Sequence, residues 1–247
     1  MTTWVVGDIH GCAAELERLI ARLKLGPEDT LVCVGDLFHR GPDPLGVLDQ
    51  LSECRARFVL GNHELAVLRR VGLAPTTTDE ADRPPLRADF PEVDASDLDG
   101  DGHRPCANVS PERRVDVLRF LQRHDGFALR SSELEHAGST PDGAAWVAIH
   151  AGVVPGTPLD AQSIRSLTTL RHLDAPGKPW WYESWRGPEL VLFGHTPSPV
   201  PRAHQAGGRL VALGLDTGCV YGGRLTAYSP DEDELVAVRA ERAYARA

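Results

Sequence analysis

Asp36 and Arg40 are the two side chains in this sequence that most directly suggest a chemistry. An apolar run over residues 31–34 ends in Gly35-Asp36, and Arg40 follows four residues later. A carboxylate held at a strand end can share its oxygens between two cations, and a guanidinium can bind a phosphate through two parallel hydrogen bonds. The pair therefore suggests phosphoryl chemistry.

The same pattern, an apolar run that ends in Gly and a potential metal ligand, recurs along the chain. It predicts buried strands whose carboxyl ends carry polar groups, and in α/β sheets this edge is where sites form. The strands expected to deliver such groups cover residues 3–7, 31–34, 58–60, 146–149, 190–193 and 210–215. Two closing strands are expected at residues 225–228 and 235–238, and helices at residues 13–25, 44–54 and 111–124, with a further helix beginning at Leu65.

The polar groups at these strand ends form one candidate site. They combine carboxylate, amide and imidazole donors without a thiolate, a set that suits Mn, Fe, Co, Ni or Zn rather than Ca. With Asp36 as a bridge, two such ions about 3.5–4 Å apart would bind a phosphate and turn a trapped water into hydroxide. The collected residues are Asp8, His10, Asp36, Asn62, His63, His150 and His195.

Each of these groups also has an ordinary structural interpretation. A single Gly-Asp or Gly-His at a strand end is usually a turn, and a lone buried His is usually a satisfied core residue. Five such endings in order are hard to obtain from turn chemistry alone. The histidines without this context are expected to be solvated, namely His103, His124, His136, His172 and His204. The aromatic stretch at residues 179–187 is expected to pack, with stacking on a base as the alternative.

Length and composition predict one domain over residues 1–247. A chain of this size can bury a full core, and α/β domains of this length are often single. Residues 72–110 contain clustered Asp and Pro and few apolar side chains, which predicts an acidic, mobile insertion. The amphipathic helix expected at residues 111–124 would join that insertion to form a cap over the site.

The charge and cysteine content exclude several function classes. The net charge of −9 offers no general attraction to nucleic acids or anionic membranes. The five cysteines are widely spaced and include no C-x-x-C pair, so we expect a reduced, cytoplasmic protein. Neither a signal peptide nor a run long enough to span a membrane is evident. Neither extended nucleic-acid binding nor membrane association is therefore expected.

These motifs in this order closely resemble those of the calcineurin-like metallophosphoesterases, and within them the phosphoprotein-phosphatase-like branch. The resemblance covers nearly the whole chain except residues 72–110 and the last few residues. It implies an α/β fold of two packed mixed β-sheets flanked by helices, a four-layer sandwich. The motifs that carry it are Gly7-Asp8-Ile9-His10-Gly11, Gly35-Asp36 with Arg40-Gly41-Pro42, Gly61-Asn62-His63-Glu64, His150-Ala151-Gly152 and Gly194-His195-Thr196.

The resemblance also implies roles for the site residues. One metal ion would be held by Asp8, His10 and Asp36, and the other by Asp36, Asn62, His150 and His195. His63 and Arg40 would act on the phosphate as catalytic residues beside Asp36, and Asn62 would help to bind the substrate. The expected cofactor is a pair of divalent transition-metal ions, Mn²⁺ by preference, with Fe, Co, Ni or Zn as alternatives.

His39 distinguishes two functions within this family. Protein phosphatases of the family normally carry Asp at this position, where it orients the histidine that corresponds to His63. Symmetrical diadenosine tetraphosphatases and the related ApaH-like phosphatases lack that Asp, and residues 213–227 also look more like that group. Expelling a serine alkoxide needs a good general acid, whereas a nucleotide phosphate, with a last pKa of about 6, leaves with little help.

We therefore predict a small-molecule nucleotide substrate, diadenosine tetraphosphate or a related dinucleoside polyphosphate, hydrolysed at a phosphoanhydride by a metal-bridging hydroxide. The alternative is a serine/threonine or broader protein phosphatase, with a phosphoprotein as substrate. A non-catalytic binding module is the third class. The complete ligand set argues against it.

Overall fold

Residues 1–75, 110–134 and 140–246 are described by the computed structural model, and their strands form two five-stranded mixed sheets. In the first sheet, β1, β2 and β3 are parallel, β9 pairs antiparallel with β1, and β10 pairs antiparallel with β9. The strands lie in the order β10-β9-β1-β2-β3 and are β1 (Thr3–Val6), β2 (Thr30–Cys33), β3 (Arg57–Phe58), β9 (Arg224–Ser229) and β10 (Glu234–Arg239).

The second sheet also combines parallel and antiparallel strands. Its central strands β5, β6 and β8 are parallel, and an antiparallel strand lies on each edge. The strands lie in the order β4-β5-β6-β8-β7 and are β4 (Ala128–Arg130), β5 (Trp146–Ile149), β6 (Leu190–Phe193), β7 (Arg202–Ala206) and β8 (Arg209–Gly214).

Alternation along the strands builds two hydrophobic layers. Val5 and Val32 belong to a cluster that includes side chains of the second sheet, such as Trp146, so the two sheets face each other. Val6 and Leu31 point to the opposite face, where they join the cluster that includes the helices. Because successive side chains of a strand point to opposite faces, fully apolar strands of this kind are buried on both sides.

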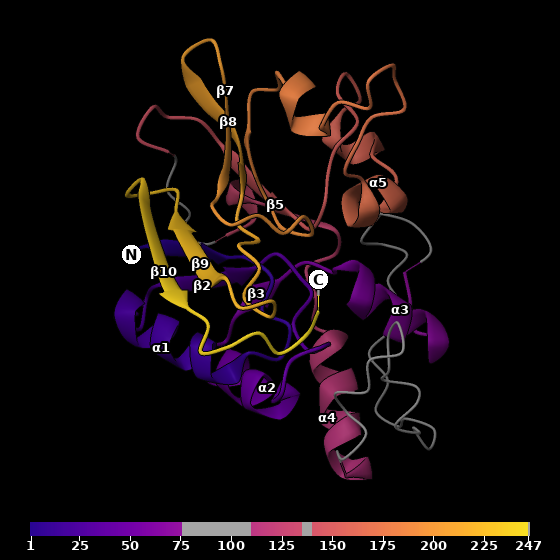
Figure 1. Ribbon diagram of the computed structural model, residues 1–247, viewed down its shortest axis with the longest axis vertical. Coiled ribbons are helices and arrows are strands. Elements are labelled where there is room, and N and C mark those ends of the chain that lie inside the picture. Colours follow the sequence, from indigo (N-terminus) through magenta and orange to yellow (C-terminus); the bar gives the residue numbers. More distant parts are fainter. Residues whose placement is uncertain (76–109, 135–139, 247) are drawn as a thin grey trace.

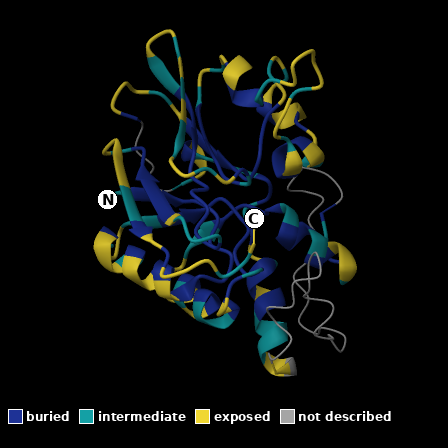
Figure 2. Ribbon diagram, in the orientation of Figure 1, coloured by how far each residue is buried: buried dark blue, intermediate teal, exposed yellow. Residues whose placement is uncertain are grey.

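The helices cover the outer faces of the sheets. Figure 1 shows α1 (Ala13–Leu23) and α2 (Pro44–Glu53) along the outer side of the first sheet, with α5 (Ile164–Thr169) beside the second sheet. Figure 2 shows exposed residues along the outer surfaces of α1 and α2, while the central strands of the two sheets are buried. α3 (Asn62–Arg70) follows β3 directly. The two packed mixed sheets flanked by helices confirm the predicted fold class.

The helix expected at residues 111–124 is present as α4 (Pro111–Leu121). It packs against α2 and α3, and the Phe120 ring stacks on the Phe58 ring with centroids 4.9 Å apart. Most of the predicted 72–110 insertion lies outside the described residues. The cap over the site and the single-domain organisation therefore stay predictions.

Candidate active site

The first sheet contributes the acidic part of the site. Asp8 and His10 follow β1, and Asp36 follows β2, as the sequence patterns predicted. His10 and Asp36 both have left-handed backbones, with φ of 50° and 52°. Non-glycine residues adopt this conformation at a cost and are concentrated in functional sites. Asn62 and His63 occupy the first turn of α3, rather than the end of a strand.

The second sheet contributes the remaining histidines. His150 follows β5 and His195 follows β6. The backbone N–H of His195 donates to both carboxylate oxygens of Asp8, each at 3.1 Å. The two sheets therefore meet through a hydrogen bond between these predicted site residues.

All the predicted site residues come together where the carboxyl ends of the parallel strands of the two sheets meet. Seven of them line one cavity of about 230 Å³. The eighth, His150, is fully buried beside it, with Nε2 3.0 Å from Asn62 Oδ1 and Nδ1 2.8 Å from the Val34 carbonyl oxygen. The seven are Asp8, His10, Asp36, Arg40, Asn62, His63 and His195.

Asp36 is at the centre of this arrangement. Its carboxylate oxygens lie 3.6 Å from His10 Nε2, 3.8 Å from His63 Nε2 and 3.5 Å from His150 Nε2. Two groups of possible metal ligands share Asp36, and the donor atoms of each group lie within 4.8 Å of one another. One group is Asp36 with His10 and His63, and the other is Asp36 with His150 and His195.

The protonation states of the site suit cation binding. Burial lowers the pKa of His10 and of His195 to about 3, so both imidazoles are neutral at pH 7 and keep a lone pair for a metal. Burial raises the pKa of Asp216 to about 7, and the Asp36 carboxylate acts in the same direction. Burial, with Asp216 and Asp36 as neighbours, also raises the pKa of Asp8. Carboxylates that repel one another in a buried site are stabilised by cations, so the residues present fit a metal centre.

Glu64 supports Asp36 from outside the cavity. Its buried carboxylate accepts hydrogen bonds from the backbone N–H groups of Asp36 at 2.7 Å, Leu37 at 2.8 Å and Gly61 at 3.1 Å. These bonds connect the loop after β2 to the start of α3. The Gly61-Asn62-His63-Glu64 motif contained this residue, but sequence reasoning gave it no role.

Two arginines, Arg40 and Arg171, line the cavity. Arg40 Nη1 donates to the Tyr221 hydroxyl at 2.8 Å and lies 3.2 Å from His10 Nε2. Arg171 Nη2 donates to the His195 carbonyl oxygen at 2.9 Å. Sequence reasoning missed Arg171 and Tyr221. Tyr221 lies in the 213–223 stretch that the family resemblance singled out, whereas no motif marks Arg171.

His39 lies beside His63, with ring centroids 4.8 Å apart. Both side chains are buried. An imidazole therefore occupies the neighbourhood in which the protein phosphatases of the family were expected to carry a carboxylate. His63 Nε2 also lies 3.8 Å from a carboxylate oxygen of Asp36.

The other histidines and the aromatic stretch are also placed by the structure. His124 was expected to be solvated, but it is buried and its Nδ1 accepts a hydrogen bond from Gly126 N at 2.9 Å, which corrects that prediction. His172 and His204 are not buried, and His103 and His136 lie outside the described residues. Trp181 and Trp185 are buried, so the aromatic stretch packs as expected. Trp180 lies between the His172 ring and the Arg202 guanidinium.

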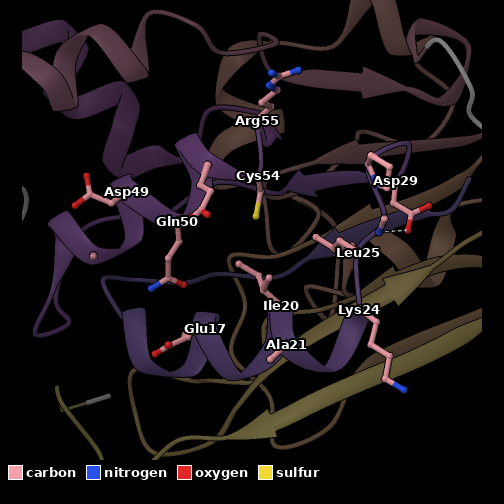
Figure 3. Close-up of a pocket in the computed structure, with 14 residues that line it drawn as sticks. Glu17, Ile20, Ala21, Lys24, Leu25, Asp29, Asp49, Gln50, Cys54 and Arg55 are labelled. Atoms are coloured by element: carbon pink, nitrogen blue, oxygen red, sulfur yellow. Dashed lines mark hydrogen bonds between the residues drawn. The ribbon is translucent and has the colours of Figure 1, made fainter.

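A larger cavity lies elsewhere, between α1 and α2. It has a volume of about 1100 Å³ and is lined by side chains such as Ile20, Leu25, Asp49 and Cys54 (Figure 3). Apolar, acidic and basic groups are mixed there, with no cluster of possible metal ligands. The described helices also include none long and apolar enough to cross a membrane.

Comparison with known proteins identifies the family. The family model described as calcineurin-like phosphoesterase matches residues 1–222, which include every predicted site residue. The chain belongs to the calcineurin-like phosphoesterases. Members of this family are hydrolases that use divalent metal ions, which agrees with the two ligand groups around Asp36.

Similar calcineurin-like phosphoesterases include two symmetrical bis(5'-nucleosyl)-tetraphosphatases. The protein from Janthinobacterium sp. (strain Marseille) is 30% identical, with 97% of this chain and 96% of that protein covered. The protein from Chromohalobacter salexigens is 31% identical, with 92% and 94% covered. A crystal structure of a candidate diadenosine tetraphosphatase is 30% identical, with a TM-score of 0.69 over 96% of this chain and 93% of that one.

Proposed function

We propose that this phosphoesterase hydrolyses a phosphoanhydride in dinucleoside polyphosphates, with diadenosine tetraphosphate as the substrate. Symmetrical cleavage by one water would give two molecules of ADP. The relatives named symmetrical bis(5'-nucleosyl)-tetraphosphatase support this proposal, since they are about 30% identical over nearly their whole length. The observation that carries it is the His39 ring beside His63.

The proposed metal ligands share Asp36, as the two groups around it do, but include Asp8 in place of His63 and add Asn62. Asp8, His10 and Asp36 would hold one divalent ion, and Asp36, Asn62, His150 and His195 would hold the other. Two such ions would polarise the phosphate and activate a water. Mn²⁺ is the ion we propose, because the donors are carboxylate, amide and imidazole groups. We propose the cytoplasm as the compartment.

The side chains around these ligands have separate tasks. Arg40 would bind a non-bridging phosphate oxygen, because its guanidinium faces the cavity and the Tyr221 hydroxyl accepts one of its hydrogens. Arg171 also lines the cavity and would bind a second phosphate of the substrate. His63 lines the cavity beside Asp36 and would hold the proton needed by the departing group.

The leaving group decides between the candidate substrates. His39 places an imidazole beside His63, at a position where a carboxylate would favour the protonated form of His63. A general acid with an imidazole at that position is adequate for a nucleotide phosphate, whose last pKa is about 6. It is poorly matched to a serine alkoxide, which must be protonated as it leaves. The anhydride is therefore favoured over the phosphoprotein.

One experiment separates the two substrates. The Mn²⁺-loaded protein is incubated with diadenosine tetraphosphate and, separately, with a phosphoserine peptide, and the products are identified by chromatography. We expect ADP as the nucleotide product and a higher kcat/KM for the dinucleotide. Products of ATP and AMP would contradict symmetrical cleavage. A higher kcat/KM for the peptide would support the protein phosphatase instead.

A further inference from the structure

A third group of potential metal ligands lies outside the active site. Cys12 precedes the first turn of α1, Glu15 is three residues further along the same helix, and Cys219 belongs to the loop between β8 and β9. The two sulfurs and a Glu15 carboxylate oxygen all lie within 4.8 Å of one another. Each of the three residues is at most 1% exposed.

The Glu15 carboxylate is held in a fixed orientation. Its Oε1 accepts hydrogen bonds from Arg18 Nη2 at 2.9 Å, Glu241 N at 3.0 Å and the Tyr244 hydroxyl at 3.1 Å. Its Oε2 is buried, and no described residue donates a hydrogen bond to it. A buried acceptor without a partner is costly, so a ligand is expected at this oxygen.

We propose that Cys12, Glu15 and Cys219 form a second metal site, which takes one thiolate-preferring divalent ion such as Zn²⁺. Two sulfurs and one carboxylate oxygen are a ligand set that Zn²⁺ favours. In tetrahedral coordination, with bonds of about 2.3 Å to sulfur and about 2.0–2.2 Å to oxygen, neighbouring ligand atoms lie roughly 3.5–3.8 Å apart. The separations within the cluster are compatible with that spacing.

Binding of the ion would change the charge and protonation of this site. On binding, each thiol releases its proton to solvent and the two thiolates and the carboxylate bind the cation. The bound cluster then carries one net negative charge, and Arg18 forms an ion pair with Glu15 at 2.9 Å. The three hydrogen bonds to Oε1 resemble the outer partners that orient carboxylate ligands at metal sites.

The position of the cluster gives it a structural role. It joins the start of α1 to the loop that carries Cys219, and Tyr221, two residues further on, contacts Arg40 in the active site. The C-terminal segment packs on the same loop, because Tyr244 N donates to the Val220 carbonyl oxygen at 2.8 Å. An ion here would hold this loop against the first helix.

Cobalt substitution tests the proposal without relying on activity. The full chain is produced in zinc-depleted medium supplemented with Co²⁺, and the near-ultraviolet absorption is recorded. A sulfur-to-cobalt charge-transfer band reports thiolate ligation, and the proposed active-site ligands contain no sulfur. We expect the band in the unaltered protein and its loss in Cys219→Ser. Cys54→Ser, which alters a cysteine outside the cluster, should retain it.

Zinc content gives a second measurement. In protein produced with Zn²⁺, Cys12→Ser and Cys219→Ser should each lose about one ion per chain, whereas Asp36→Asn should retain that ion. The charge-transfer band of the unaltered protein tests the proposal even if these variants do not fold. Absence of the charge-transfer band in the Co²⁺ protein would overturn the proposal. So would a disulfide-linked Cys12–Cys219 peptide in a digest of the unreduced protein.

Discussion

At the scale of single residues, Asp36 connects the two proposed metal sites. Its carboxylate is within 4 Å of three imidazoles, which come from the loop after β1, the first turn of α3 and the loop after β5. The strand-end pattern was sufficient to find Asp36 and its partners from sequence. The pattern could not identify Arg171, which bonds the His195 carbonyl oxygen, or the hydrogen bond from Asp36 N to Glu64. Both contacts depend on how segments distant in sequence approach one another.

His39 gives the first prediction. A carboxylate at this position would favour the protonated form of His63 and so assist poor leaving groups. His39→Asp should raise kcat/KM for alkyl phosphates and leave kcat/KM for diadenosine tetraphosphate little changed. Both values are measured at one Mn²⁺ concentration, with the uncharged His39→Asn as the matched control. An equal change for both substrates would show that His39 acts through metal binding or local structure.

Arg40 gives the second prediction. Its guanidinium is held in the cavity by the Tyr221 hydroxyl, and a hydrogen bond to a charged group contributes about 1.5–3 kcal/mol. Arg40→Ala should therefore raise KM for diadenosine tetraphosphate by about 10- to 100-fold. Arg40→Lys should recover part of the loss, because lysine keeps the charge but lacks the planar fork. Steady-state kinetics measure the effect, with the exposed Arg165→Ala on α5 as the control. Unchanged kinetics in Arg40→Ala would exclude the phosphate contact.

At the scale of elements, the carboxyl ends of two sets of parallel strands meet at one edge. The long apolar strands were predictable because they are buried on both faces. The edge strands β4 and β7 were not, because β4 has three residues and β7 (RAHQA) alternates half-buried and exposed side chains without an apolar run. The sequence pattern placed the start of α3 at Leu65, which is too late, because Asn62 and His63 look like loop residues. The pattern does not show that the Glu64 carboxylate accepts a hydrogen bond from Gly61 N at the start of this helix.

Gly194 shows how closely these elements approach. A Cβ at this position would lie 2.0 Å from Asp8 Oδ1 and 2.8 Å from Val34 Cγ2. Gly194→Ala should displace Asp8, lower the bound metal content and destabilise the fold by about 1–3 kcal/mol. Urea unfolding and metal analysis measure the two effects. Gly26→Ala is the control, since its Cβ would meet Asp29 Oδ2 at 3.4 Å. Equal metal content and stability in both variants would contradict the close approach.

At the scale of the whole molecule, the proposed metal ligands lie on both sheets. Asp8, His10 and Asp36 follow strands of the first sheet, and His150 and His195 follow strands of the second. Bound ions would therefore fasten the sheets together at an edge where buried carboxylates otherwise repel one another. This coupling of the two sheets through the metal ligands could not be predicted from the sequence patterns, because they do not show which faces of the two sheets pack together.

Metal binding should consequently stabilise the whole fold. With Mn²⁺ at about 1000 times its Kd, binding to the native state adds about 4 kcal/mol per site to the free energy of unfolding. Thermal unfolding with Mn²⁺ and after chelation should show a higher Tm with the ion. Asp36→Asn should lose most of the Mn²⁺-dependent increase, because it removes a ligand of both sites. The same Tm with and without Mn²⁺ in the unaltered protein would contradict the metal assignment.

The hydrogen bond from His195 to Asp8 joins residues 187 positions apart. Contacts of such high sequence separation form late, because the chain must first lose the entropy of closing a very long loop. During synthesis, Asp8 and Asp36 leave the ribosome long before His195 exists. A chain released before His150 would carry four of the six proposed metal ligands and no competent site, so premature termination should yield inactive fragments instead of an unregulated hydrolase.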